Sequence, residues 1–176
     1  MQKNWYIIYT KPKCEKKVAA AFSKKKIKNY LPATCKHVNS IWKSKLIYEP
    51  LFDSYIFANI TETEIAKIRT VDGVVNLVYW KGQPAIIHEN EIEAIREFTN
   101  DYQDIYLEKT MINPDEEMKV IDGPKYLMEG NLLTIKNTSV KVNLPSIGFT
   151  MIAKIDSENE IGRKISFGNT ELSLQS

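Results

Sequence analysis

The chain has 176 residues, 43% of them hydrophobic, and a formal net charge of +2. This length and composition suit a folded protein with a buried core, and they exclude the disordered, collagen-like and coiled-coil classes. No window approaches the roughly 18 uncharged apolar residues of a membrane span, and residues 1–10 lack the apolar stretch of a signal peptide, so we expect a cytoplasmic protein without membrane contact.

The charge is not spread evenly along the chain. Residues 1–45 contain twelve lysines and one acidic residue, a net charge of +11, whereas residues 46–176 carry a net charge of −9. Positive charge concentrated in one part of the chain favours a polyanionic partner for one face of the molecule. Ordinary solubilisation by surface lysines is the alternative interpretation.

A strand and a helix are predicted first. Residues 5–10 form an aromatic and β-branched run that is typical of a strand buried on both faces. Pro12 suits the first turn of a helix, whose apolar stripe at helical spacing ends within residues 23–26. A neighbouring flank of that helix carries Lys13, Lys16 and Lys17, which form either a binding surface for a polyanion or a solvated helix face.

Strands and helices alternate through the rest of the first hundred residues. Pro32 interrupts the strand-like residues 29–38, which places this proline at an edge or a bulge. Thr61 and Glu64 have the spacing of a capping box that opens a helix. The element order predicts one α+β sandwich with an antiparallel sheet, and its other segments are strands at 43–52, 54–60 and 74–80 and an acidic helix at 88–98.

A second module is predicted after a linker. The apolar periodicity lapses between residues 99 and 115, so residues 102–114 are predicted to be the linker. Short strand-like runs with tight turns follow at roughly ten-residue spacing, which is typical of a small β-barrel at 115–157. The Ser-, Glu- and Asn-rich residues 158–176 are predicted to be a flexible tail.

Enzymatic chemistry finds little support in the sequence. The two histidines, His37 and His88, are far apart, no acidic or Cys/His cluster has metal-ligand spacing, and no glycine-rich phosphate-binding loop is present. Cys14 and Cys35 are expected to be reduced thiols with packing roles. We therefore predict a protein that is not an enzyme and that uses no metal or cofactor.

Three segments of the chain follow one known pattern. Residues 5–16 read WYIIYTKPKCEK, residues 51–57 read LFDSYIF, and residues 120–130 begin with Val and hold Gly-Pro before a final Gly. In this order and spacing they resemble the opening motif, the F-P-G-Y-x-(F/L) signature and the KOW motif of the NusG family of bacterial transcription elongation factors. The resemblance implies an α+β NGN domain at 1–101 and a KOW domain, which is an SH3-like barrel, at 115–157.

The resemblance also implies a partner for the first domain. In this family the NGN domain docks on the clamp helices of RNA polymerase and suppresses pausing. The matching docking residues in this chain are Phe52, Tyr55 and Phe57. An exposed aromatic patch is costly unless a partner covers it, which fits such a role. Burial of these side chains in the core is the alternative interpretation.

Two further binding sites follow from the same resemblance. The basic flank of the first helix is expected to follow the displaced non-template DNA strand, through Lys11, Lys13, Lys16 and Lys17. The KOW domain of the family contacts a ribosomal protein or a termination factor. Of these two partners, a ribosomal protein is the one expected here, and the residues in the contact loop are Leu144, Ile147 and Phe149. The protein is expected to be a monomer.

The chain also departs from the family pattern. Asp53 and Ser54 replace the Pro-Gly of the signature, so the turn at this point must form without glycine. The divergence resembles the RfaH-like and UpxY-like antiterminators of surface-polysaccharide operons, which predicts an antitermination factor that acts at specific operons. A general elongation factor of the NusG type, or a stand-alone module that binds nucleic acid or the ribosome, is the alternative.

The RfaH type has a C-terminal domain that can refold into helices packed on the NGN patch. In this chain glycines and prolines interrupt any long helix between residues 123 and 148. We therefore expect strands in the C-terminal domain.

Overall fold

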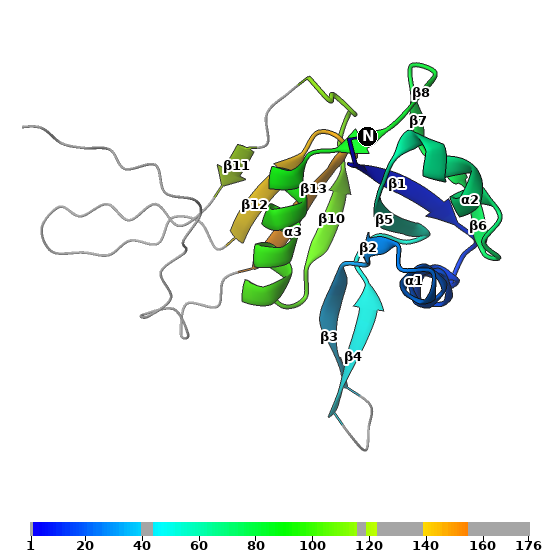
Figure 1. Cartoon of the computed structure of the whole chain (residues 1–176). Coiled ribbons are helices and arrows are strands. Elements are labelled where there is room, and N and C mark those ends of the chain that lie inside the picture. The colour runs from blue at the N-terminus through cyan, green and yellow to red at the C-terminus, as the bar shows by residue number, and fades with distance from the viewer. Residues whose placement is uncertain (1, 40–43, 116–118, 123–138, 155–176) are drawn as a thin grey trace, which may run out of the picture.

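The computed structural model describes residues 2–39, 44–115, 119–122 and 139–154 of the 176-residue chain. Figure 1 shows two sheets side by side, with helices α1 and α2 on the first sheet and helix α3 against the second. None of the helices in these described ranges has the length and apolar character that a bilayer span needs.

The first sheet is antiparallel and is built around β1 (Asn4–Thr10). Along β1, Trp5 to Ile8 are all buried, as the sequence predicts for a strand covered on both faces. Its neighbours in the sheet are β5 (Tyr55–Ile60) on one side and β6 (Val74–Leu77) on the other, with β2 (Lys28–Tyr30) outside β5 and β9 (Ile86–Ile87) beside the start of β1.

One face of this sheet is closed by helices from nearby in the chain. Helix α1 (Glu15–Lys24), the short 3-10 helix η1 (Glu62–Glu64) and α2 (Ile65–Arg69) lie on it, and the capping box predicted at Thr61 is confirmed. Gly73 has a φ of 95°, and a Cβ there would come within 2.9 Å of Cγ2 of Val18, so only glycine lets the chain pass this close to α1.

Two hairpins extend from the first sheet. The larger one is β3 (Ala33–Asn39) with β4 (Ser44–Pro50), and Figure 1 shows it projecting from the body of the molecule. Pro32 separates β2 from β3, so the predicted break of the 29–38 segment is confirmed. The smaller hairpin is β7 (Tyr79–Trp80) with β8 (Gln83–Pro84).

The second sheet is also antiparallel, in the order β10 (Tyr106–Lys109), β13 (Phe149–Lys154), β12 (Ser139–Leu144), β11 (Lys119–Asp122). Strand β10 lies inside residues 102–114, so the expectation that this segment lacks regular structure is wrong for these four residues. Four residues are too few to show the alternation of apolar and polar side chains by which a strand is predicted. Residues 123–138 and 155–176 lie outside the described residues, so the closed barrel and the tail remain predictions.

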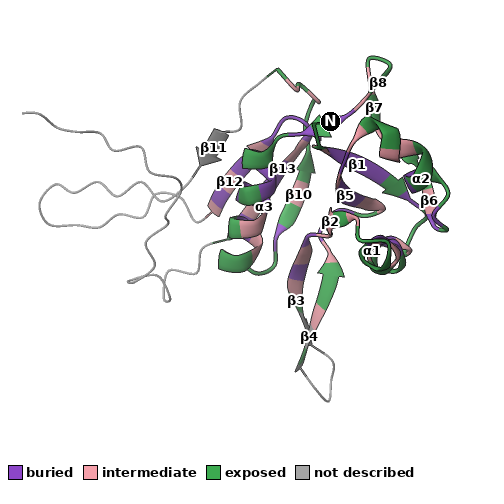
Figure 2. Ribbon diagram, in the orientation of Figure 1, coloured by how far each residue is buried: buried purple, intermediate pink, exposed green. Residues whose placement is uncertain are grey.

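Helix α3 (Glu89–Asp101) joins the two sheets into one core. Its apolar residues Ile92, Ile95 and Phe98 pack in the same cluster as Trp5 and Phe57 of the first sheet, and the second sheet contributes Val142 and Met151. Figure 2 shows buried residues continuing from β1 and β5 to β12 and β13. The second sheet is therefore packed against the first part of the molecule through this core.

Candidate functional site

The face of the first sheet opposite α1 carries a row of aromatic side chains. Tyr9 pairs with Tyr55 across β1 and β5, and their ring centroids are 5.7 Å apart. Phe57 lies further along β5, and Phe52 meets it edge-on from the preceding turn at 5.7 Å. The structure therefore brings the three predicted docking residues together, and we call Tyr9, Phe52, Tyr55 and Phe57 the aromatic face.

The turn before β5, which presents the aromatic face, has Ser54 where the family pattern has glycine, and a buried carboxylate binds its backbone. Ser54 has a φ of 64°, the left-handed conformation for which the family pattern has glycine. Its N–H donates to Oε1 of Glu15 at 2.7 Å, and its carbonyl accepts from the Thr10 N–H at 2.8 Å. Glu15 is 5% exposed, so the single acid of the first 45 residues supports this turn and does not offset the lysines on the surface.

The aromatic face is covered by the second sheet. Phe52 and Phe57 are each 1% exposed, and Tyr55 is half-buried. The ring of Phe149, at the start of β13, stands edge-on to Phe52 at 5.6 Å and to Tyr55 at 6.5 Å. The expectation of an exposed patch is therefore wrong in this structure, because the apolar inner side of the second sheet shields it from water.

The covering residues are the ones predicted to bind a separate partner. Leu144 is the last residue of β12, Ile147 lies in the following turn, and Phe149 begins β13. Leu144 and Ile147 are buried, and Phe149 is half-buried against the aromatic face. Two surfaces that the sequence assigns to two different partners thus cover each other.

Buried hydrogen bonds hold the covering turn in place. One oxygen of the Glu91 carboxylate accepts from the Ser146 N–H at 3.1 Å, and the other accepts from the His88 N–H at 3.1 Å at the start of α3. Gly148 has a φ of 68°, and a Cβ there would lie 2.7 Å from Cγ1 of Ile112. The turn is therefore fixed between α3 and the segment that follows β10.

The cover does not fit the aromatic face completely. A cavity of about 50 Å³ lies between the two, lined on one side by Ile7 and Phe57 and on the other by Ile112 and Ile147. Tyr9, at the end of the row, is 40% exposed. The interface thus contains a small apolar cavity, and the aromatic face reaches solvent at Tyr9.

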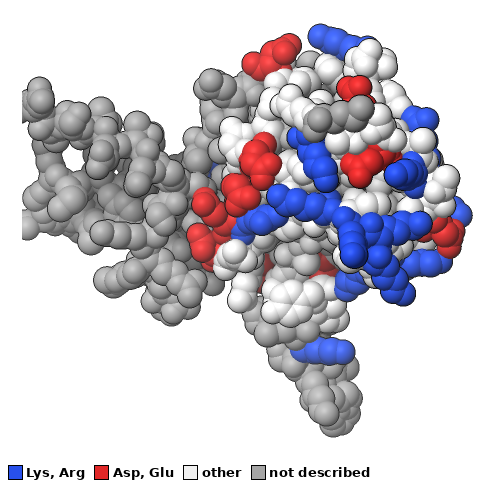
Figure 3. Space-filling model, in the orientation of Figure 1, with Lys and Arg blue, Asp and Glu red and all other residues white. Residues whose placement is uncertain are grey.

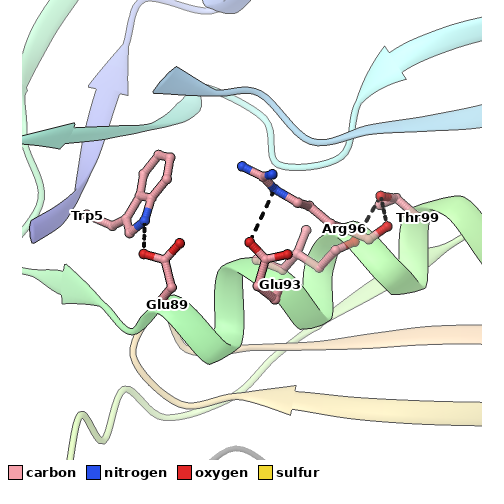
Figure 4. A network of polar contacts seen from close by, with 6 residues as sticks. Trp5, Glu89, Glu93, Arg96 and Thr99 are labelled. Atoms are coloured by element: carbon pink, nitrogen blue, oxygen red, sulfur yellow. Dashed lines mark hydrogen bonds and ion pairs between the residues drawn. The ribbon is translucent and has the colours of Figure 1, made fainter. Parts of the chain in front are cut away.

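Helix α3 is tied to the first sheet by polar and aromatic contacts. Trp5 Nε1 donates to Oε2 of Glu89 at 2.5 Å, as Figure 4 shows. The Arg96 guanidinium lies over the Tyr30 ring at 4.8 Å from its centroid, and burial raises the pKa of that tyrosine. These contacts anchor α3 on the first sheet independently of the second sheet.

The predicted DNA-binding lysines all lie on the surface. Lys17 pairs with Asp72 at 2.5 Å, and this hydrogen bond raises the pKa of Lys17 and lowers that of Asp72. Lys16 Nζ donates to the Tyr48 carbonyl at 3.0 Å. Lys11 and Lys13, on the chain that enters α1, are exposed. Figure 3 shows a band of Lys and Arg over α1 that continues toward α3, where Asp and Glu gather.

Comparison with known protein families gives one match, to a family model described as "Transcription termination factor nusG", over residues 3–96. The matched segment is more than half of the 176-residue chain and contains the whole first sheet, α1, α2 and the turn of the aromatic face. The chain belongs to the NusG family. The matched residues are thus a domain of a transcription factor family.

Solved structures of NusG-type proteins are similar to the chain. One, described as "Domain interaction in Thermotoga maritima NusG", has 21% sequence identity and a TM-score of 0.40, with 89% of this chain and 99% of that chain covered. Another, described as "Crystal Structure of MjSpt4:Spt5 complex conformation A", has 16% identity and a TM-score of 0.32, with 85% and 99% covered. None of the curated proteins compared with the chain matches it.

Sequence analysis missed the contacts that close this NusG-family site. Glu91 follows His88 at capping-box spacing, but histidine is not among the favoured N-cap residues, so the pattern did not stand out. The second role of Glu91, accepting from Ser146, joins residues that are 55 positions apart and leaves no local signal. Gly148, at the end of the range in which glycines and prolines were expected to interrupt a long helix, lies in the turn before β13, but its close approach to Ile112 has no sequence signature.

Proposed function

We propose that the chain is a transcription elongation and antitermination factor, not an enzyme, that binds RNA polymerase through Phe52, Tyr55 and Phe57. The observation that carries this proposal is the aromatic face. Three aromatic side chains on one side of a sheet, covered by another part of the same chain, have the composition of an interface hot spot. Membership of a transcription factor family supports the choice of polymerase as the partner.

Docking of this kind requires the cover to leave. At 1% exposure, Phe52 and Phe57 have almost no surface to offer to another protein while Phe149 is in place. The resting protein is then closed and the polymerase-bound protein is open. The apparent affinity for polymerase is the affinity of the open form reduced by the fraction of molecules that are open.

The first sheet is suited to survive this opening. Helix α3 stays attached through the contacts of Trp5 with Glu89 and of Tyr30 with Arg96, and none of these residues belongs to the second sheet. The surface that becomes exposed is then the aromatic face of a folded domain and the inner side of the second sheet. The inner side, with Leu144, Ile147 and Phe149, is the surface we assign to a ribosomal protein, and it becomes free in the same step.

The basic surface on α1 is assigned to DNA. Lys11, Lys13 and Lys16 are exposed, and α1 itself presents no acidic side chain to solvent because Glu15 points inward to Ser54. Phosphates of the displaced non-template strand fit this surface by charge complementarity. Divergence from the family signature at Asp53 and Ser54 favours a specialised antiterminator over a general factor.

A transcription assay with purified polymerase on a template that carries a pause site and a terminator tests this function. The wild-type chain is expected to shorten the pause and raise readthrough. Tyr55→Ala, which removes a half-buried ring from the aromatic face, should abolish both effects. Tyr106→Ala is the matched control, because that tyrosine lies on β10 and is 54% exposed.

Two results would overturn the proposal. One is a folded Tyr55→Ala protein that acts like wild type, because the aromatic face would then have no role in the effect. The other is a wild-type chain that binds polymerase but changes neither pausing nor readthrough.

A further inference from the structure

Tyr48 on the projecting hairpin is an exposed aromatic ring without a partner in the described part of the chain. It is 64% exposed, more than any other tyrosine in these ranges. The other exposed tyrosines have partners: Tyr9 packs on Tyr55, Tyr79 accepts a hydrogen bond from Arg69, and Tyr106 faces Lys154. The Tyr48 ring therefore presents its surface to solvent.

The hairpin holds the backbone of Tyr48 beside the basic helix α1. Lys16 Nζ donates to the Tyr48 carbonyl at 3.0 Å, and this hydrogen bond holds the C-terminal end of β4 against the helix. Leu51 N–H donates to the Pro32 carbonyl at 2.8 Å and closes the base of the hairpin. An ammonium group has three N–H donors, so Lys16 keeps two for a phosphate while it holds β4.

The acidic residue next to Tyr48 points to the other side of the hairpin. Tyr48 pairs with Cys35 across the two strands, so their side chains share one face. Glu49 lies on the opposite face and pairs there with Lys36 at 3.2 Å. No carboxylate of β4 therefore competes with a phosphate on the side that carries the Tyr48 ring.

A ring beside cationic side chains is the arrangement that single-stranded nucleic acid requires. Bases of a single strand are free to stack on an aromatic side chain, and the backbone follows the cations. A duplex offers no free base face for such a ring. We propose that Tyr48 is a stacking platform for one base of a single DNA strand whose phosphates lie along α1. This inference rests on the DNA-binding role assigned to α1 above and adds the residue that holds a base.

The test uses the full-length chain and a short single-stranded oligodeoxythymidine that carries one 2-aminopurine, whose fluorescence is quenched by stacking. Wild type should bind this probe and quench it. Tyr48→Ala should weaken binding by about tenfold and abolish the quenching, because a base–aromatic stack is worth on this order. Tyr48→Phe, which keeps the ring and loses the hydroxyl, should behave like wild type.

Salt dependence separates stacking from charge. Tyr48→Ala should leave the slope of affinity against salt concentration unchanged, whereas Lys13→Ala should reduce it by about one phosphate contact. Polymerase affinity, measured by co-sedimentation, should be the same for wild type and Tyr48→Ala. Loss of polymerase binding by Tyr55→Ala is read separately, so failure of the polymerase proposal and failure of this one are distinguishable.

The inference is overturned if wild type does not bind the probe, if Tyr48→Ala binds and quenches like wild type, or if Tyr48→Phe is as weak as Tyr48→Ala. Tighter binding of a duplex than of the single strand would also overturn it. If Tyr48→Ala instead loses polymerase, the hairpin is a protein-contact surface and the stacking role is wrong. Because Tyr48 is exposed, thermal melting is expected to be the same for the three proteins.

Discussion

The two faces of the first sheet are both apolar, but they are closed in different ways. The face toward α1 is covered by elements that lie close in the chain, and every residue of its core falls between positions 6 and 77. The aromatic face is covered by α3 and by strands that follow position 138. The first closure is therefore local in sequence, whereas the second depends on segments that lie far along the chain.

Under the proposed function, this difference separates burial that is permanent from burial that ends when polymerase binds. A side chain such as Phe22 packs in the α1 core, which is closed by residues near it in the chain. A side chain such as Phe52 is equally buried here, yet its cover includes the ring of Phe149 from the second sheet. Low exposure alone therefore does not distinguish a core residue from a docking residue whose site is closed.

The largest expected effect on stability is in the α1 core. Phe22→Ala should lower the free energy of unfolding by about 3–5 kcal/mol, because it removes a fully buried ring from the α1 core. Urea denaturation followed by circular dichroism measures this loss. If the comparison holds, polymerase affinity of the remaining folded protein does not increase. An increase would mean that the α1 core also gates the docking face.

A smaller effect is expected at the hydrogen bond that holds the cover. Glu91→Gln replaces one of the two accepting oxygens by an NH2 donor, so one of the N–H groups of His88 and Ser146 loses its acceptor, which should cost about 1–3 kcal/mol. Hydrogen exchange should become faster at the Ser146 amide. Glu93→Gln is the control on the same helix, because its pair with Arg96 is partly exposed and is worth little. Unchanged protection at Ser146 would show that Glu91 does not hold the turn.

A substitution in the turn before β5 is expected to increase stability. Ser54→Gly should stabilise the protein by up to about 1 kcal/mol, since glycine adopts the φ of 64° without strain. The same substitution in a helix, Ser23→Gly in α1, should destabilise it by a similar amount. Thermal melting of the two variants gives the comparison. A loss of stability in Ser54→Gly would mean that the serine is not strained in this turn.

The smallest effect is at the capping box. Hydrogen bonds from the backbone N–H and hydroxyl of Thr61 lower the pKa of Glu64, so its carboxylate stabilises the fold above the ordinary value of 4.5 and this contribution is lost as the pH falls through the lowered pKa. Glu64→Gln should remove that pH dependence and cost at most about 0.5 kcal/mol at neutral pH, because the site is only half-buried and solvent screens its charge. Denaturation of both proteins between pH 2 and 7 measures it, and parallel curves would contradict the assignment.

Sequence patterns predicted most of the first sheet because its signals are local. The buried run of β1, the break at Pro32 and the capping box at Thr61 each depend on neighbouring residues. The resemblance also grouped Phe52, Tyr55 and Phe57 in one patch, and the structure brings these side chains together. Alternation reports that a face is apolar, but it contains no information about what covers it.

The cover itself could not be predicted for the same reason. Phe149 and Phe52 are far apart in sequence, and the resemblance to a known family assigned the two regions to separate partners. The strand β10 was missed because four residues are too few for a periodic signal. The exposed position of Lys11, Lys13, Lys16 and Lys17 was predicted correctly, because lysine is rarely buried without a partner. Their role in binding DNA remains a prediction.

The central claim is that the aromatic face is a polymerase site closed by the second sheet, and a titration of core RNA polymerase with wild type and Phe149→Ala tests it most directly. Phe149→Ala removes the covering ring and leaves Phe52, Tyr55 and Phe57 intact. The account predicts that this variant stays folded and binds polymerase more tightly than wild type. Equal or weaker binding by a folded Phe149→Ala protein would contradict it.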